Sequence, residues 1–449
     1  MKSEIKQRIT QLNNGEIPDG YIKNDFGVFP CDWVTDRTFG DLFDFYGGLG
    51  KSRDELGDKG HAYLHYGDMH RGNFSIVSLE RYSQLPKCDV VLKGNETYLM
   101  EDGDVAFLDA SEDLDGTSRA VLIDNPDNKP FIAGLHIIYG KSKDASLEKW
   151  YKQYITSSEN VRKQFQKLAV GFKVYGVNRD TLPRIKVAYP QTANEQSKIA
   201  EILMKWDEAI ELYNRQIEKL KLLKSVCLKK MFPKKGEKVP EWRFSDFTDD
   251  WEQRKLLSLC DKFTDGDWIE AKDQSSSGVR LIQTGNVGVA EYLDKPNNKK
   301  WVSKETFEAL HCEEVFEGDI LISRLPEPAG RACIVPNIGT KMITAVDCTI
   351  VRVSENISNE FLLQYLSSQK YFDEVNSCLA GGTRQRISRS NLADFDIPVP
   401  VQKQEQQAIG HFFRQLDNLI TLHQRKVESI EKQRKVLQQY LLNGIVRVK

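Results

Sequence analysis

The sequence predicts an α+β protein in which two mixed α/β domains alternate with two long helices. The helices are expected to pair as an antiparallel coiled coil with pseudo-two-fold symmetry. The first of three observations behind this prediction is the length of 449 residues, too many for one ordinary domain. Residues 190–232 also align without a gap to residues 400–442, with ten of 43 positions identical where about three are expected from typical composition. Finally, both copies carry apolar residues at heptad spacing.

The central helix is predicted over residues 191–235, directly after Pro190, because proline cannot lie in a helix interior. Its apolar residues are four and three positions apart, which is the spacing of a coiled-coil seam. The seam positions expected to pair with the other helix are Ile199, Leu203, Trp206 and Ile210. About 40 residues at ~1.5 Å each predict a helix of roughly 60 Å.

The second long helix is predicted over residues 401–449, and its matching seam positions are Ile409, Phe413, Leu416 and Ile420. Lys224 and Arg434 interrupt the two seams at equivalent places. His423, also on the seam, is expected to be a core or rim histidine and not a ligand. A seam of this length must be buried, and the other copy is the most economical partner. A second apolar stripe leaves surface for further contacts, and it comprises Leu212 and Leu223 in the first helix and Phe412, Leu419 and Leu422 in the second.

The segments before the helices are related more weakly. The gap-free alignment of the helices, which we call the repeat register, extends upstream through Leu182 and Leu392 to Gly171 and Gly381. Farther upstream, Gly67-Asp68 parallels Gly285-Asn286, and Gly103-Asp104 parallels Gly318-Asp319. Short β-type runs lie between these points, at 90–92, 137–139, 319–322 and 348–351, each bounded by turn residues.

These observations divide the chain into four parts. We predict an N-terminal segment with the first domain over 1–190, the central helix over 191–235, a second domain over 236–400, and the C-terminal helix over 401–449. Residues 1–12 resemble the end of the central helix, as if a circular arrangement were opened near the end of the second helix.

Composition predicts a cytoplasmic protein without a membrane span or signal peptide, because no apolar run is long enough for either. The eight cysteines include no C-x-x-C pair, which favours neither a disulfide framework nor a zinc site. Lys plus Arg (63) nearly equals Asp plus Glu (65), so a basic DNA-binding surface would need local segregation of charge. Such segregation exists, since residues 101–115 carry seven acidic and no basic side chains.

Two motifs carry a family resemblance. Each motif is a strand that ends in proline, followed by a Glu-Gln pair and an isoleucine that open a long helix. The two motifs are AYPQTANEQSKIAEIL at 188–203 and IPVPVQKQEQQAIGHFF at 397–413. Supporting pieces are GGLGKSRDEL at 47–56, YGDM at 66–69, AGLH at 133–136 and TRQRIS at 383–388. Over essentially its whole length the chain resembles the specificity (S) subunit of type I restriction-modification systems. The second copy departs by having Pro398 where the first has Ala188, and by lacking the GKS residues of 50–52.

The resemblance implies a non-catalytic subunit with two target-recognition domains that bind double-stranded DNA. Two different domains imply an asymmetric two-part site. The implied partners are two methyltransferase (M) subunits and endonuclease/translocase (R) subunits, with no membrane involved. No cofactor is expected in this chain, because S-adenosylmethionine, ATP and Mg²⁺ would belong to those partners.

Polar loops supply the candidate DNA contacts, since Arg and Lys neutralise phosphates while Arg, Asn and Gln read base edges. The candidates of the first domain are Lys51, Arg53, Arg71, Asn178 and Arg179, and those of the second are Lys300, Arg324, Arg384, Gln385 and Arg386. The stretches 176–179 and 383–388 are expected at equivalent places before the strand that leads into each long helix.

Other interpretations remain open at this point. Gly47–Ser52 resembles a P-loop, but position 45 is Phe where a Walker A motif requires Gly, so a phosphate-contacting or plain surface loop is favoured. Asp250 with Glu270 and Lys272 loosely fits a nuclease pattern that chance also explains in a chain that is 29% charged. A coiled-coil scaffold or adaptor without DNA recognition is the alternative to the specificity subunit.

Overall fold

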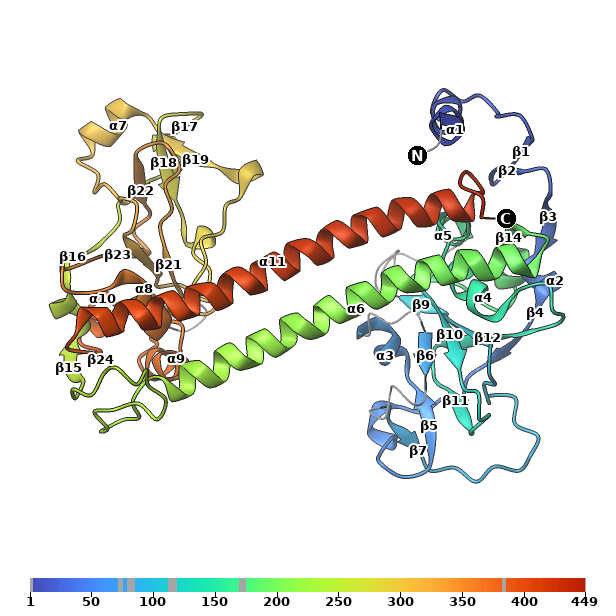
Figure 1. Cartoon of the computed structure of the whole chain (residues 1–449), viewed down its shortest axis with the longest axis horizontal. Coiled ribbons are helices and arrows are strands. Elements are labelled where there is room, and N and C mark those ends of the chain that lie inside the picture. Colours follow the sequence, from blue (N-terminus) through green and yellow to red (C-terminus); the bar gives the residue numbers. More distant parts are fainter. Residues whose placement is uncertain are drawn as a thin grey trace. The chain divides into compact units, whose positions relative to one another are not determined.

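The computed structural model describes residues 3–71, 76–78, 85–111, 119–168, 175–381 and 385–448. The two long helices, α6 (Ala193–Lys230) and α11 (Lys403–Leu442), lie where the repeat predicts them (Figure 1). Both are shorter than predicted, because the chain leaves the helix after Lys230 and after Leu442. No helix in the described part of the chain is long and apolar enough to cross a membrane.

The chain divides into two compact units that cut across the predicted linear order of domains. Unit 1 comprises Met1–Leu212 with Val427–Lys449, and unit 2 comprises Tyr213–Lys426. Each long helix therefore contributes one end to each unit, so that each unit holds one globular domain and parts of both helices.

In unit 1 a five-stranded sheet has the order β4-β12-β8-β10-β6, and a three-stranded sheet has the order β11-β5-β7. Strands β3 and β14 form an antiparallel ribbon that leads into α6. The elements are α1 (Ser3–Asn13), β1 (Tyr21–Asn24), β2 (Gly27–Pro30), β3 (Trp33–Thr38), α2 (Phe39–Leu42), β4 (Phe43–Gly47), β5 (His61–Leu64), α3 (Tyr66–Arg71), β6 (Ile76–Ser78), β7 (Lys87–Cys88), β8 (Val105–Leu108), β9 (Ala110–Ser111), β10 (Ala120–Asp124), β11 (Phe131–Ala133), β12 (Ile137–Ser142), α4 (Lys149–Thr156), α5 (Glu159–Leu168), β13 (Tyr175–Gly176) and β14 (Lys186–Pro190).

In unit 2 the two sheets have the orders β16-β23-β20-β21 and β17-β19-β18-β22, and β15 pairs with β24 in the ribbon before α11. The elements are β15 (Glu252–Lys255), β16 (Cys260–Asp265), β17 (Gln274–Ser275), β18 (Val279–Ile282), β19 (Lys300–Val302), α7 (Lys304–Ala309), β20 (Ile320–Ser323), β21 (Ala332–Ile334), β22 (Met342–Thr344), β23 (Cys348–Val353), α8 (Asn359–Tyr365), α9 (Gln369–Ser377), α10 (Arg389–Ala393) and β24 (Asp396–Val399).

The two units share one topology. The order β4-β12-β8-β10 of unit 1 matches β16-β23-β20-β21 of unit 2, and the parallel pair β5·β11 matches β18·β22. The number of residues that separates matching elements changes along the chain. It is larger between β5 and β18 than between α6 and α11. Insertions and deletions between the helices therefore explain why the sequence repeat is clear in the helices and weak in the domains.

The strand predictions succeed where the apolar run is buried on both faces. Runs 137–139 and 348–351 fall within β12 and β23, and run 319–322 overlaps β20 except at Asp319. Every residue of β8 is buried, as expected for a strand covered on both sides. The predicted strand at 90–92 is wrong. Val91 is 84% exposed, and no strand pairs with this run among the described residues. Only Val90 of this run packs against the core formed by Tyr63, Cys88 and Ile132, so the run lacks the two-sided burial of a strand.

The first turns of each long helix pack into the core of a globular domain. Ile199 and Leu203 belong to the core of unit 1, and Ile409, Phe413 and Leu416 to that of unit 2. Of the remaining predicted seam positions, Ile420 is buried, whereas Trp206 and Ile210 are half-buried. The predicted seam positions are therefore buried or half-buried. Those at the start of each long helix pack against residues of the sheets and short helices as well as against helix residues.

The chain ends meet within unit 1. The Arg8 guanidinium donates to the Ile445 carbonyl at 2.8 Å, and the Tyr21 hydroxyl donates to the Gly444 carbonyl at 2.6 Å. The N-terminal helix α1 and the strand β1 are therefore held to the segment that follows α11. This contact agrees with the likeness of residues 1–12 to a helix end.

Candidate nucleic-acid interface

The Glu-Gln pair of each helix-entry motif is buried and fixes the domain to its helix. The Gln196 amide donates to the carbonyls of Ser146 and Pro190, both at 2.9 Å, and accepts from the Glu148 backbone N–H at 2.7 Å. Gln406 makes the equivalent set of contacts, with Asn356, Pro400 and Ser358. Since both amides are 1% exposed and fully used, the motif that carries the family resemblance is structural.

The glutamates of the two motifs are held by equivalent bidentate arginines. Arg447 reaches Glu195 with N–O distances of 2.6 and 2.8 Å, and Arg243 reaches Glu405 at 2.7 and 2.8 Å. Each arginine lies in the segment that follows one long helix, and each glutamate lies in the first turn of the other. The beginning of one helix is thereby tied to the end of the other within each unit.

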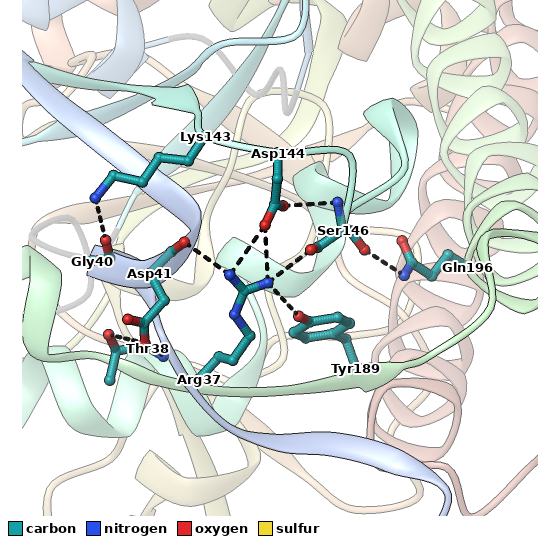
Figure 2. A network of polar contacts seen from close by, with 9 residues as sticks. All are labelled: Arg37, Thr38, Gly40, Asp41, Lys143, Asp144, Ser146, Tyr189 and Gln196. Atoms are coloured by element: carbon teal, nitrogen blue, oxygen red, sulfur yellow. Dashed lines mark hydrogen bonds and ion pairs between the residues drawn. The ribbon is translucent and has the colours of Figure 1, made fainter.

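Unit 1 adds a network around Arg37 that secures the ribbon β3–β14 (Figure 2). The Arg37 guanidinium donates to the Asp144 carboxylate at 3.0 Å and to the Ser146 hydroxyl at 2.7 Å, and lies 3.5 Å from the Tyr189 hydroxyl. Because the Ser146 carbonyl accepts from Gln196, the network continues into the start of α6. The ribbon, the loop after β12 and the helix are fixed together.

Charged residues that interrupt the seams pair across the helices. In unit 1, Arg434 of α11 bonds to Asp207 of α6 at 3.1 Å, and the Tyr154 hydroxyl donates to the same carboxylate at 2.9 Å. In unit 2, Lys224 bonds to Asp417 at 2.6 Å, and the Gln364 amide lies 3.3 Å from that carboxylate. The repeat register aligns Asp207 with Asp417 and Lys224 with Arg434. The basic residues that interrupt the heptad pattern therefore form the same kind of ion pair in both units.

His423 lies beside its own repeat equivalent. Its ring contacts Tyr213 edge to face in unit 2, with centroids 5.5 Å apart. The repeat register aligns Tyr213 with His423, so equivalent positions of α6 and α11 contact each other there, as antiparallel helices require. Its position on a half-buried seam agrees with the interpretation as a core or rim histidine.

Four segments of the chain converge at one end of the larger sheet in unit 1. The Gly48 and Leu49 N–H groups donate to the carbonyls of Ile137 and Ala133 at 3.0 and 2.8 Å. The Asp109 N–H donates to the His136 carbonyl at 3.2 Å, and the Val177 N–H donates to the Asp109 carbonyl at 2.8 Å. The loops after β4 and β8, the turn between β11 and β12, and the segment leading to β14 therefore form one surface, which we call loop edge 1.

Unit 2 repeats these four backbone bonds. Gly266 and Asp267 donate to the carbonyls of Cys348 and Thr344, both at 2.9 Å. Arg324 donates to the Asp347 carbonyl at 2.9 Å, and Ile387 donates to the Arg324 carbonyl at 3.2 Å. We call this surface loop edge 2. The same backbone framework thus carries different side chains: Asp109 and His136 of edge 1 correspond to Arg324 and Asp347 of edge 2.

A glycine is required at the same place in both edges. A Cβ atom on Gly48 would lie 1.9 Å from the Gly134 carbonyl oxygen, and one on Gly266 would lie 2.2 Å from that of Thr344. The loop that follows also matches, because a capping box of Ser52 and Glu55 in edge 1 corresponds to one of Glu270 and Asp273 in edge 2. The second copy therefore lacks the GKS residue types but keeps their backbone turn.

Loop edge 1 presents paired charges and aromatic rings. Arg53 bonds to Asp68 at 2.9 Å, which joins the loop after β4 to helix α3. Lys51 bonds to Glu55 at 2.7 Å, and this contact, together with the Ser52 backbone N–H, lowers the pKa of Glu55 to about 2. His136 has its Nδ1 3.0 Å from the Asp109 carboxylate, and its ring contacts that of Tyr66 edge to face.

Loop edge 2 contains arginines held by carboxylates. Asp265 accepts from the Thr349 hydroxyl at 2.8 Å and lies 3.4 Å from the Arg324 guanidinium and 3.7 Å from that of Arg389. Arg386 is exposed and lies 3.8 Å from the Asp347 carboxylate. Trp268, on the loop after β16, is 72% exposed, an unusual position for a large aromatic side chain.

The predicted DNA contacts on the loop edges are not all free to reach a ligand. Five have exposed or half-exposed side chains: Lys51, Arg53, Arg179, Gln385 and Arg386. Arg324 is on edge 2 but is 8% exposed and donates to the Val346 carbonyl, so it holds its loop in this conformation. The Asn178 side chain stabilises its own turn, because its Oδ1 accepts hydrogen bonds from the N–H groups of Asp180 and Thr181.

The other predicted contacts are placed differently. Lys300 is half-buried in β19. The Arg71 side chain and Arg384 lie outside the described residues.

Sequence reasoning missed Arg389, Asp265, Asp347 and Trp268. Arg389 could have been found, because the repeat register aligns it with Arg179. The others required the strand pairing, since the offset between the copies differs in that part of the domain.

Each acidic residue of the loose nuclease pattern is paired with a lysine. Glu270 pairs with Lys272, and Asp250 pairs with Lys238. No group of three His, Cys, Asp or Glu side chains suited to a metal occurs within the described ranges.

Comparison with known proteins agrees with this duplicated geometry. The family model for the type I restriction modification DNA specificity domain matches residues 32–222 and 248–432, once in each repeat. The chain belongs to this family.

One relative spans nearly the whole chain, and another spans about two thirds of it. The putative type I restriction enzyme MjaX specificity subunit of Methanocaldococcus jannaschii is 24% identical over 444 residues, covering 96% of this chain and 97% of the relative. The MjaVIII specificity subunit of the same organism is 27% identical over 312 residues, covering 66% and 70%. The crystal structure of the S subunit of a type I restriction-modification system from M. genitalium shares the fold, with a TM-score of 0.58 at 16% identity and coverage of 91% and 96%.

Proposed function

We propose that this chain is the DNA-specificity subunit of a type I restriction-modification complex and reads an asymmetric two-part site through loop edges 1 and 2. The observation that carries the proposal is the backbone framework repeated in both units with different side chains. A repeated framework suits two surfaces that approach the same kind of ligand, whereas different side chains suit different base sequences. The family membership supports the same interpretation.

In this proposal the chain selects the site and its partners perform the chemistry. Two methyltransferase subunits would carry S-adenosylmethionine, and endonuclease/translocase subunits would use ATP and Mg²⁺. The exposed apolar side chains of the long helices are candidate contacts for these partners: Leu212 is 52% exposed, and Leu422, its repeat equivalent, is 60% exposed. A pair of equivalent helix surfaces would accept two copies of one partner.

The test is to co-express the chain with its cognate methyltransferase subunit and to map methylated adenines across the host genome. We expect a single asymmetric two-part motif. Trp268→Ala removes an exposed ring from edge 2 and is expected to relax or change only one half of that motif. Trp242→Ala is the matched control, because this tryptophan is 42% exposed in unit 2 but packs against Lys230 away from the edge.

Two outcomes would contradict the proposal. If an intact complex, active with a different specificity subunit, methylates no defined motif, the scaffold hypothesis is favoured. If Trp268→Ala and Arg386→Ala both leave the motif unchanged while substitutions elsewhere alter it, the loop edges are not the reading surfaces.

A further inference from the structure

One pair of arginines is common to the two loop edges, although most other side chains there differ. Arg179 and Arg389 are aligned by the repeat register that aligns the long helices. Each directly follows a residue that caps its own turn: Asn178 accepts from the Thr181 N–H at 2.9 Å, and Ser388 accepts from the Asn391 N–H at 3.0 Å. The two arginines are therefore presented from equivalent turns.

Their guanidinium groups also lie beside equivalent backbone positions. In unit 2, Arg389 lies 3.7 Å from the carboxylate of Asp265, the last residue of β16. In unit 1, a Cβ atom on Gly47, the last residue of β4, would lie 3.9 Å from the Arg179 guanidinium. Strand pairing agrees with the match, because Gly47 is opposite the second residue of β12 and Asp265 is opposite the second residue of β23.

A feature shared by two surfaces that read different sequences belongs to the part of the ligand that does not vary. In duplex DNA that part is the sugar-phosphate backbone, and exposed arginines are suited to it by charge and by bidentate geometry. Both arginines meet this requirement, since Arg179 is exposed and the Arg389 side chain is 46% exposed. The positions that differ between the edges, such as Asp109 and Arg324, remain for sequence.

We infer that Arg179 and Arg389 are equivalent phosphate contacts that set each loop edge against the DNA backbone, and that Asp265 weakens the second contact by competing for Arg389. This inference rests on the proposed function and assigns roles within it. It predicts an asymmetry: Arg179 faces a glycine where Arg389 faces a carboxylate. Unit 1 therefore holds the backbone more strongly through this position than unit 2 does.

The first test measures DNA binding by the full-length chain in complex with its methyltransferase subunit, at ~50 and ~200 mM salt. One phosphate contact contributes about 0.9 to the steepness with which log K falls against log salt. The ratio of wild-type to variant affinity should therefore be about 3.5-fold smaller at ~200 mM than at ~50 mM salt. Arg179→Ala and Arg389→Ala should each show this reduction, on specific and unrelated duplexes alike. Arg425→Ala, which removes an exposed arginine from α11, controls for overall charge.

The second test exchanges the acidic partner. Gly47→Asp places a carboxylate beside Arg179 and should weaken binding severalfold, whereas Gly47→Ala should not, because nothing lies closer than 3.9 Å to the added Cβ. Asp265→Asn keeps an acceptor for the Thr349 hydroxyl but removes the charge, and should strengthen binding and steepen the salt dependence. Thermal unfolding of each variant separates these effects from misfolding.

The outcomes distinguish the inference from the function on which it rests. If the wild-type complex binds its two-part site and both arginine variants keep the wild-type salt slope, the inference is wrong and the proposed function stands. A change of the methylated motif by Arg179→Ala or Arg389→Ala, without a uniform loss of affinity, would make them base-reading residues and also overturn it. A wild-type complex without sequence-dependent binding would overturn both.

Discussion

Replacing Arg243 with alanine should be among the most destabilising single changes on the helix-entry motifs. Arg243 makes a bidentate contact with Glu405, whose side chain is 1% exposed, and the Trp251 indole N–H donates to the same carboxylate at 3.2 Å. In Arg243→Ala the indole bond remains but the counter-charge is lost. Removing one partner of a buried ion pair costs about 3–5 kcal/mol, because the other charge stays buried without compensation.

The measurement is thermal unfolding of the purified chain, with a double-mutant cycle through Glu405→Gln. For units of about 200 residues, 1 kcal/mol corresponds to a shift of roughly 2–4 °C in the midpoint, so Arg243→Ala should lower the midpoint for unit 2 by about 6–20 °C. The double variant should be more stable than Arg243→Ala alone, since glutamine carries no charge that would stay buried without a partner. Arg425→Ala is an exposed control on α11 and should shift the midpoint little.

Two results would refute this reasoning. An Arg243→Ala midpoint close to that of wild type would mean that the glutamate is hydrated or paired otherwise, and that the motif is not a structural anchor. A double variant less stable than Arg243→Ala would mean that the carboxylate acts mainly through Trp251. Arg447→Ala repeats the experiment in unit 1, where the same glutamate position is bound but Arg447 also contacts Asp32.

The glycines of the loop edges, the charge pair between the long helices and a buried acid give further predictions. Gly48→Ala and Gly266→Ala should each abolish recognition of one half-site, because the added Cβ meets a carbonyl oxygen at 1.9 and 2.2 Å; methylation mapping tests this, and normal methylation by both would contradict it. Asp207→Arg should lower the thermal midpoint by placing like charges beside each other, and Asp207→Arg with Arg434→Asp should recover part of the loss; no recovery would mean that the pair is not coupled. Burial raises the pKa of Asp104 to about 7, so its contribution to stability falls as pH rises from about 4 to about 7. The free energy of unfolding of Asp104→Asn should therefore increase relative to that of wild type by up to about 2–4 kcal/mol as pH rises through this range. A difference between the two thermal unfolding midpoints that stays constant with pH would refute the raised pKa.

Much of the architecture could be predicted because it depends on local periodicity. The sequence placed the start of each long helix within two residues, although the predicted ends lie five and seven residues too far along the chain. The repeat register also makes Asp207 equivalent to Asp417 and Lys224 equivalent to Arg434. The glycine-acid turns at 103–104 and 318–319 were also paired correctly: both glycines have positive φ, and both acids accept from a backbone N–H earlier in the same turn. Such features are set by residues close in sequence, so they leave a recognisable pattern.

The candidate site was predicted less well, because its residues come together through strand pairing. Arg324 has the polarity of a DNA contact, and only the packing of its loop against Val346 and Asp265 reveals that it is held inside. Asp265 and Asp347 carry no motif of their own. Their importance depends on lying opposite or beside arginines that are distant in sequence, such as Arg389.

The duplication, the two long helices and the family can all be inferred from the amino-acid sequence, since each depends on residue spacing within one chain. The tertiary structure decided which residues of the motifs are anchors and which face outward. It made the Glu-Gln pairs internal supports and gave the two loop edges a common backbone with different side chains. The physical reason is that burial and charge pairing are properties of neighbours in space, and in this fold those neighbours come from β-strands and helix ends distant in sequence.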